Sequence, residues 1–316
     1  MNNKIFILEP RAGLCNQLNC ITIGIVLGIL YKRDLYFNGF QIDYMNENIL
    51  TNFDNIIDVS KLKKICKKYN IKILDNIDFT IDDVPILNTN NEIINDTKDI
   101  FSYLSLEDNL NIHILNLKNP ISTFIPDEHQ ELYNNIKLNI KFNQKFYKIA
   151  KDIKKQYKLD NYCCVHLRME DDAIDFIEKK MNKDNVELIN DIYKQTYIQE
   201  LERLFNLDLN IYVCTSLCMF ENKNNLFYKI IKKKYNLIDK NDIIKNYDLN
   251  NDLNNDLNNE HNQRELYGIV DYIIALDSEY FTGCDWSSFS IAIKNNHMHN
   301  NKMYNLLNIW NMCANS

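Results

Sequence analysis

The chain has 316 residues, enough for two domains of ordinary size. Its 46% hydrophobic and 25% charged residues are typical of a globular protein, and only six glycines and four prolines exclude a fibrous or generally disordered chain. The net charge of −7 argues against a nucleic-acid-binding protein, which is usually basic, but it does not exclude a nucleotide ligand held by a local arginine.

The apolar stretches and the cysteines bear on the compartment. The apolar run at residues 5–8 is too short for the hydrophobic region of a signal peptide, and the longest such stretch, Ile21 to Tyr31, is shorter than a membrane span. The nine cysteines are odd in number and lie mostly in apolar runs, which predicts reduced thiols. The spacing of Cys214 and Cys218 does not match a closed zinc site. We therefore expect a cytoplasmic protein with no membrane span and no bound metal.

The first half of the chain begins with a strand, a helix and a second strand. This opening is typical of a nucleotide-binding domain, although the glycine fingerprint GxGxxG is missing. The polar residues 75–108 are expected to form loops and short elements. The expected elements are a strand at 4–8, a helix at 14–30, a strand at 34–37, a helix capped by Ser60 and running to about Tyr69, strands at 71–74 and 110–117, and an amphipathic helix at 142–157.

The second half repeats this alternation. The expected elements are a strand at 162–167, a helix at 186–205 with Leu188, Ile192, Ile198, Leu201 and Leu204 inward, a strand at 210–214, helices at 226–235 and 264–276, a strand at 279–282 with a turn after it, and a helix from Ser287 to about Lys294.

The composition also predicts the domain limits. We expect an N-terminal domain at 1–158, a C-terminal domain at 159–300 and a tail or helix at 301–316. Tandem Asp-Leu-Asn-Asn units within 247–262 have too little apolar content to form a core, so this stretch is predicted to be an exposed insertion.

The buried strand at 162–167 runs directly into a cluster of charge. Arg168 follows the strand, and Glu170, Asp171 and Asp172 come next. The carboxyl ends of strands are where open α/β sheets bind ligands, and a guanidinium is a planar cation suited to phosphate. The alternative is a surface arginine paired with its own acidic neighbours, and this stretch alone does not decide between the two.

Two further stretches are expected at the cleft of a two-domain α/β protein. Residues 13–17 follow the first strand, and Ser287 and Ser288 open the last helix. The backbone N–H groups and hydroxyls at a helix N-terminus can bind an anion. A simple helix cap by either serine is the other interpretation, and both can hold together.

Together these stretches resemble the fucosyltransferase superfamily that uses GDP-fucose, and in particular the protein O-fucosyltransferases. That family carries a G-x-x-N-Q loop, here Gly13 to Gln17, and an H-x-R-x-x-x-D strand end, here His166, Arg168 and Asp172. It also carries a late helix with an aspartate, an acid-x-F-x-G strand and an S-S-F turn. These match Asp271, Glu279, Phe281, Gly283, Ser287, Ser288 and Phe289, with glutamate at 279 where relatives often have aspartate.

The resemblance implies a GT-B architecture, in which two Rossmann-like domains face a cleft and the C-terminal one holds most of the donor. Arg168 would bind the β-phosphate and stabilise the leaving diphosphate, and Asn16 would reach the reacting centre and the acceptor hydroxyl. The other implied nucleotide-sugar contacts are Gly13, His166, Asp172 near the sugar or Arg168, Asp271 at the guanine or ribose, and Ser287, Ser288 and Phe289 at the phosphates.

The implied reaction is inverting transfer of fucose from GDP-fucose to a hydroxyl of a protein or glycan, without a cofactor. A metal is not expected, because Arg168 can supply the positive charge. The general base is left open among Glu9, Asp171, Asp172 and the departing phosphate itself. The alternatives are a GT-B transferase with another nucleotide sugar and a non-catalytic protein that binds nucleotide sugars or glycans.

Overall fold

The computed structural model describes residues 4–42, 49–78, 86–88, 104, 114–118, 125–181, 186–217, 222–241 and 264–314. The insertion expected at 247–262 lies outside these residues, as does most of the polar stretch 75–108. The chain forms two compact units, unit 1 (Met1–Gln144) and unit 2 (Lys145–Ser316), each with its own parallel sheet.

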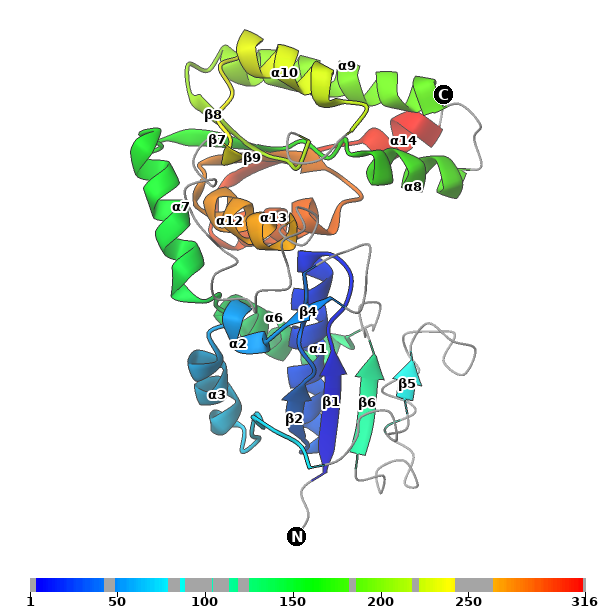
Figure 1. Ribbon diagram of the computed structural model, residues 1–316, viewed down its shortest axis with the longest axis vertical. Helices are drawn as coiled ribbons and strands as arrows, with labels where there is room; N and C mark the ends of the chain where they lie inside the picture. Colours follow the sequence, from blue (N-terminus) through cyan, green and yellow to red (C-terminus); the bar gives the residue numbers. More distant parts are fainter. Residues whose placement is uncertain are drawn as a thin grey trace. The chain divides into compact units, whose positions relative to one another are not determined.

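Unit 1 is built on a four-stranded parallel sheet in the order β2-β1-β6-β5 (Figure 1). The strands are β1 (Ile5–Glu9), β2 (Asp34–Phe37), β5 (Ile86–Asn88) and β6 (Ile114–Lys118). Helix α1 (Leu14–Tyr31) connects β1 to β2 and packs on the sheet, because most of its side chains are apolar and buried. By length and composition α1 is also apolar enough to cross a membrane, but 72% of that stretch is buried inside the unit, as in the core helix of a soluble protein.

Several elements in the rest of unit 1 differ from the sequence expectations, beginning with a helix cap and a strand. Asp58 rather than Ser60 caps α3, since the Asp58 carboxylate accepts a 3.2 Å hydrogen bond from the N–H of Lys61. The strand expected at 71–74 is reduced to one parallel bridge, between Ile73 and Leu35. The remaining described elements are β3 (Phe40–Gln41), β4 (Leu50–Thr51), α2 (Phe53–Ile56), α3 (Val59–Lys68), η2 (Asp127–His129) and α6 (Gln130–Asn139).

Unit 2 is a three-layer α/β/α sandwich. Its parallel sheet has the order β10-β9-β7-β8, with α9 and α10 on one face and α12 and α13 on the other (Figure 1). The strands are β7 (Tyr162–His166), β8 (Asn210–Cys214), β9 (Tyr280–Cys284) and β10 (Met303–Leu307). The helices are α7 (Gln144–Gln156), α8 (Asp171–Met181), α9 (Val186–Phe205), α10 (Asn225–Lys234), α12 (Arg264–Asp277), α13 (Ser288–His299) and α14 (Ile309–Ala314).

The limits of unit 2 differ from the expected domain limits. The division falls between Gln144 and Lys145 rather than near Leu159, so α7 goes with unit 2, where its Lys154 pairs with Asp277 at the end of α12. Residues 301–316, expected as a tail or helix, supply the edge strand β10 and also α14, whose Ile309 and Cys313 are fully buried.

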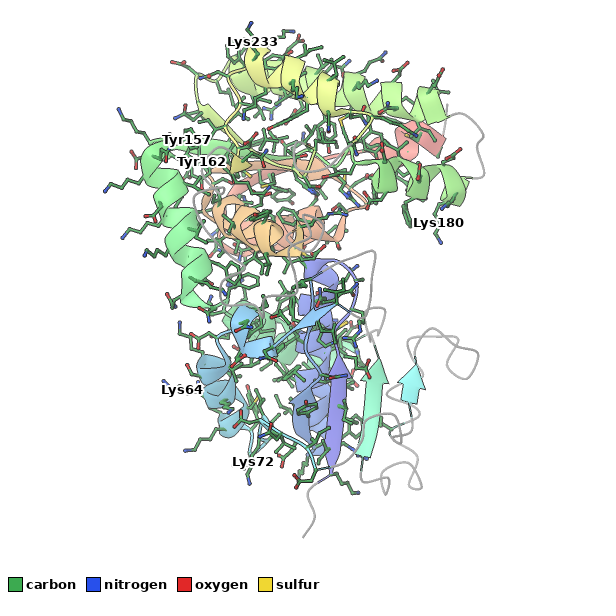
Figure 2. All side chains as sticks on the ribbon, in the orientation of Figure 1. Lys64, Lys72, Tyr157, Tyr162, Lys180 and Lys233 are labelled. Atoms are coloured by element: carbon green, nitrogen blue, oxygen red, sulfur yellow. The ribbon has the colours of Figure 1, made fainter. Side chains whose placement is uncertain are left out.

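The inward face of α9 also differs from its prediction. Leu188 is 38% exposed, whereas Tyr193 and Tyr197 are completely buried (Figure 2 draws the side chains). The prediction is correct for Leu201 and Leu204 and wrong for Leu188. It counted only aliphatic residues, whereas the innermost row of this helix also contains aromatic residues whose hydroxyls have hydrogen-bond partners.

Candidate active site

Arg168 lies just beyond the end of a central strand of unit 2. Strand β7 is flanked by β9 and β8 and is fully buried, and Arg168 is the first partly exposed residue after it, with a side chain that is 16% exposed. Its guanidinium forms a fork on the carboxylate of Asp172, in which Nη1 donates to Oδ1 at 3.0 Å and Nη2 donates to Oδ2 at 2.6 Å.

The Nη1 atom of Arg168 also donates to Oε2 of Glu170 at 2.7 Å, so two of the three carboxylates that follow the strand in the sequence, those of Glu170 and Asp172, contact the guanidinium. A second cation belongs to the same cluster, because Nη2 of Arg264 lies 3.6 Å from Oδ2 of Asp172. The alternative interpretation, a surface arginine paired with its own acidic neighbours, is thus correct about the pairing. The cluster, however, is largely buried rather than on the open surface.

The charges of this cluster stabilise one another. Burial alone would lower the pKa of Arg168, but the carboxylates of Glu170 and Asp172 raise it well above its ordinary value. Burial likewise tends to raise the pKa values of Glu170 and Asp172, but Arg168 outweighs that effect and lowers both. All three groups therefore carry full charge at neutral pH.

The two carboxylates are held differently. The Oε1 atom of Glu170 accepts hydrogen bonds from the N–H of Ser216 at 3.1 Å and from its hydroxyl at 2.7 Å, and the Glu170 side chain is only 10% exposed. The Asp172 side chain is 29% exposed. Asn224 adds a further tie, because its amide donates to the carbonyl of Met169 at 2.8 Å. Glu170 is therefore a fixed support for Arg168, and Asp172 is the partner nearer to solvent.

His166, the last residue of β7, is buried against the start of α13. Its Nδ1 lies 2.8 Å from the hydroxyl oxygen of Ser290, and its ring centroid is 4.5 Å from that of Phe289. Burial lowers the pKa of His166 to about 3, so the ring is neutral at physiological pH. A neutral imidazole can donate or accept a hydrogen bond here but cannot supply positive charge to a phosphate.

The glycine of the acid-x-F-x-G strand makes room for Ser290. A Cβ atom at Gly283 would lie 2.2 Å from the Ser290 hydroxyl oxygen and 2.8 Å from its Cβ. Only a residue without a side chain fits at this position of β9. The strand thereby seats the serine that contacts His166.

Ser287, Ser288 and Phe289 form the start of α13. Ser287 occupies the N-cap position, with φ −80° and ψ 126°, but its side chain makes no capping hydrogen bond. The simple-cap interpretation is therefore wrong for Ser287. The first N–H groups of a helix have no acceptor within the helix, and its positive dipole end favours an anion. The contact of Phe289 with His166 brings this helix start to the end of β7.

Asp271 lies on α12 and is 3% exposed. Its Oδ1 accepts a 2.8 Å hydrogen bond from the Tyr212 hydroxyl, and its Oδ2 pairs with Nζ of Lys240, which also donates to the carbonyl of Thr215 at 2.7 Å. Burial raises the pKa of Asp271 to about 6. Both carboxylate oxygens thus have protein partners that tie α12 to β8 and the residues after it. The predicted contact with guanine or ribose stays a prediction.

Gly13 and Asn16 belong to unit 1, at the start of α1. Gly13 is the N-cap residue, and a Cβ atom there would meet nothing within 4 Å. The loop is shaped by Gln17, whose amide donates to the carbonyls of Ala12 and Gln41, both at 2.8 Å, and accepts from the N–H of Gln41 at 2.9 Å. Gln17 of the G-x-x-N-Q loop is therefore structural. The cleft predicted between the domains, with Asn16 facing Arg168, stays a prediction.

Sequence reasoning missed several groups at this site. Ser290, Ser216 and Arg264 contact His166, Glu170 and Asp172, respectively, from distant parts of the chain. Nothing in their local patterns marks them, except that Ser290 continues the Ser-Ser-Phe motif. Within the described ranges, no group of three or more His, Cys, Asp or Glu side chains is arranged to hold a metal ion.

Comparisons with known proteins bear on the family and the fold of the chain. A family model described as GDP-fucose protein O-fucosyltransferase matches residues 41–299. No curated protein matches the chain in sequence. Among solved structures, the NodZ α-1,6-fucosyltransferase soaked with GDP-fucose has a TM-score of 0.60 at 8% identity, covering 92% of each chain.

POFUT1 in its apo form also has a TM-score of 0.60, at 12% identity, and the match covers 97% of this chain and 98% of POFUT1. POFUT1 in complex with GDP-fucose matches with a TM-score of 0.59 at 12% identity, over 98% of both chains. These likenesses confirm the predicted GT-B class, with its two Rossmann-like domains.

Proposed function

Because the chain belongs to the GDP-fucose protein O-fucosyltransferase family and is a glycosyltransferase, we propose that it transfers fucose from GDP-fucose to a hydroxyl of a protein or glycan, with inversion at the sugar carbon. The observation that carries this proposal is the Arg168 fork at the end of β7, next to the start of α13. A guanidinium and a helix N-terminus are two independent binding groups for a diphosphate.

Arg168 binds the β-phosphate of the donor in this proposal. The fork already makes a bidentate contact with Asp172, and a phosphate presents two oxygens in the same geometry. The phosphate takes the place of Asp172, the more exposed carboxylate, while Glu170 and Ser216 keep the guanidinium in position. As the glycosidic bond breaks, negative charge grows on the phosphate oxygens, and Arg168 stabilises it.

The other residues have supporting roles in the proposal. Ser287, Ser288 and the N–H of Phe289 donate to the phosphates, and the neutral His166 lines the donor pocket. Gly13 and Asn16 contribute from unit 1, and Asp271 contacts the nucleoside. Arg168 supplies the positive charge that a metal ion provides in other transferases, so the proposed reaction needs no metal and no cofactor.

We also propose a cytoplasmic location. The eight cysteines among the described residues are free and buried, and the sulfur atoms of Cys164 and Cys214 lie 3.3 Å apart without a bond. Free thiols that are this close suit a reducing compartment.

Thermal stabilisation by nucleotides tests the donor class. GDP, GDP-fucose, GDP-mannose, UDP and UDP-glucose are compared on the wild type, on Arg168→Ala and on Arg203→Ala, a control that loses an arginine paired with Glu200 instead. We expect GDP and GDP-fucose to raise the melting temperature of the wild type and of Arg203→Ala but not of Arg168→Ala.

The rate of fucose transfer, or of donor turnover measured as slow release of GDP, should fall by roughly 10²–10³ in Arg168→Ala. A loss of this size is typical when a group that stabilises the transition state is removed. An unchanged rate would remove Arg168 from the mechanism. A preference for UDP ligands would assign the chain another nucleotide sugar, and GDP binding without any turnover would make it a binding protein.

A further inference from the structure

A single hydroxyl holds the backbone at both ends of the His-Leu-Arg segment. Tyr197 lies on α9 and is completely buried. Its hydroxyl donates to the carbonyl of His166 at 2.8 Å and accepts from the N–H of Arg168 at 3.2 Å. The two contacts use both hydrogen-bonding functions of the phenol.

These two backbone groups lie where the sheet no longer supports the strand. The register of β7 with β9 ends at Val165, opposite Thr282, while on the other side the N–H of Leu167 still donates to the carbonyl of Cys214. Tyr197 therefore acts in place of a strand partner at the last residues before the guanidinium. The direction of the Arg168 side chain depends on this backbone.

A second tyrosine, one helical turn earlier on α9, holds the other half of the site. Tyr193 is also completely buried, and its hydroxyl accepts a 2.9 Å hydrogen bond from Nε1 of Trp286. Trp286 directly precedes Ser287, the N-cap residue of α13. The two tyrosine rings are neighbours, with centroids 6.4 Å apart.

Filling the core does not account for these hydroxyls. Other core positions of α9 are filled by aliphatic side chains, those of Ile189, Leu201 and Leu204. A phenylalanine would bury the same ring without the cost of burying a polar group. Both hydroxyls instead bond to segments that carry the proposed phosphate ligands.

We propose that Tyr193 and Tyr197 are positioning residues of the donor site, with Tyr197 setting Arg168 and Tyr193 setting the start of α13. This inference rests on the proposed function. Because both tyrosines stand on one rigid helix, they fix the spacing between the arginine and the helix N-terminus, which must suit one diphosphate. Preorganised donors of this kind need no rearrangement when charge develops.

The test removes each hydroxyl alone, in Tyr197→Phe, in Tyr193→Phe and in the double variant. The matched control is Tyr162→Phe, because Tyr162 lies at the opposite end of β7 (labelled in Figure 2), is 2% exposed and donates to the carbonyl of Ile274 at 2.6 Å. Each full-length variant is measured for kcat and KM with GDP-fucose, for melting temperature, and for amide hydrogen exchange of Arg168.

We expect Tyr197→Phe to lower kcat about tenfold, since a lost hydrogen bond of ordinary strength corresponds to such a factor. The Arg168 amide should exchange faster, while the melting temperature changes no more than in Tyr162→Phe, whose kcat stays that of the wild type. Tyr193→Phe should raise the KM for GDP-fucose, and the double variant should depart from the product of the single effects because both act on one ligand.

A kcat of Tyr197→Phe within twofold of that of Tyr162→Phe would overturn the inference. So would losses of kcat that are no larger than the losses of melting temperature across the variants explain. Wild-type protein that neither binds GDP nor turns over GDP-fucose would overturn the proposed function and the donor role together. Even then, unchanged exchange at Arg168 in Tyr197→Phe would separately show that this hydroxyl does not hold the strand end.

Discussion

The residues around Arg168 illustrate how a buried charge is kept ready for a ligand. Glu170 is anchored by Ser216 and stays with the guanidinium, whereas Asp172 is more exposed and has Arg264 as a second cationic neighbour. Removing the guanidinium of Arg168 would leave the two carboxylates without their shared cation in a largely buried site. The cluster therefore stabilises the fold only as a whole, and single charge removals cost more than the pairs themselves contribute.

The first residue-scale prediction concerns Gly283. In Gly283→Ala the new methyl group overlaps the Ser290 hydroxyl, so Ser290 has to move away from His166. Overpacking of this kind lowers the free energy of unfolding by about 1–3 kcal/mol. Urea unfolding measures that loss, and GDP-fucose turnover should fall with it.

Gly13→Ala is the matched control for this substitution. A Cβ atom at Gly13 meets nothing within 4 Å, and its φ of −63° suits any residue, so the stability of this variant should equal that of the wild type. A loss of turnover at unchanged stability would support Gly13 as part of the donor site. A fully stable Gly283→Ala would show that Ser290 is not constrained by the strand.

The second residue-scale prediction follows from the pKa of His166. Burial lowers it from 6.5 to about 3, so between these values the unfolded chain binds a proton that the folded chain does not. Above about pH 6.5 the ring is neutral in both states and does not change the stability. As the pH falls from 6.5 toward 3, the unfolded chain binds the proton and the free energy of unfolding falls. His166→Gln removes the effect.

The free energy of unfolding, measured at pH 7.5 and pH 5, should fall by about 2 kcal/mol more in the wild type than in His166→Gln. Equal losses in the two proteins would mean that the imidazole titrates normally and is not shielded from water.

Sequence patterns predicted the proposed donor-binding residues but not the residues that support them. Arg168, Asp172 and the serines of 287–288 stand next to apolar strands or at helix starts, where local patterns reveal them. Tyr197 and Ser290 act through contacts with residues far away in the chain, so no local periodicity distinguishes them from ordinary core positions.

At the scale of elements, the long helices and central strands follow from the sequence, whereas the edge does not. The bounds of α9 and β8 coincide with their predictions, because both elements bury a clear apolar pattern. In strand β10 Met303 and Tyr304 are exposed, Asn305 and Leu306 are half-buried and only Leu307 is buried, so the strand lacks that pattern. Its pairing with β9 is a tertiary property.

We therefore predict that truncation after Asn300 destabilises unit 2, although the sequence predicted only a tail or helix there. The truncation removes β10 from β9 and takes the buried Ile309 and Cys313 out of the core. Thermal unfolding followed by circular dichroism should show a melting temperature lowered by roughly 10 °C or more, since losing one buried aliphatic side chain alone costs about 2–5 kcal/mol.

Met303→Ala is the control within the same segment, because Met303 is 65% exposed and contributes little to the core. Its melting temperature should equal that of the wild type. A truncated chain as stable as Met303→Ala would show that residues 301–316 do not stabilise unit 2.

At the scale of the whole molecule, the two-domain organisation was evident from the repeated strand and helix alternation, but the boundary was not. The helix α7 reads as the last element of the first half because it comes before the central strand β7. Its membership is decided by tertiary contacts, such as the pair of Lys154 with Asp277, which lie beyond any sequence pattern.

Two fragments test where unit 2 begins. The fragment 145–316 keeps α7 and should unfold cooperatively, whereas the fragment 159–316 lacks the helix residues Phe146, Ile149 and Ile153, all buried in the structure, and should melt at a clearly lower temperature. Both melting temperatures are measured by calorimetry. Equal stability of the two fragments would restore the boundary near Leu159.

The longer fragment also separates donor binding from transfer. It contains Arg168, His166 and the start of α13, so GDP should raise its melting temperature in the proposed mechanism. It lacks Asn16, which the proposal assigns to the reacting centre, and it should therefore transfer no fucose. Transfer by the fragment would show that unit 2 alone holds the whole catalytic site, while a failure of GDP to stabilise a folded fragment would show that unit 1 is needed to bind the donor.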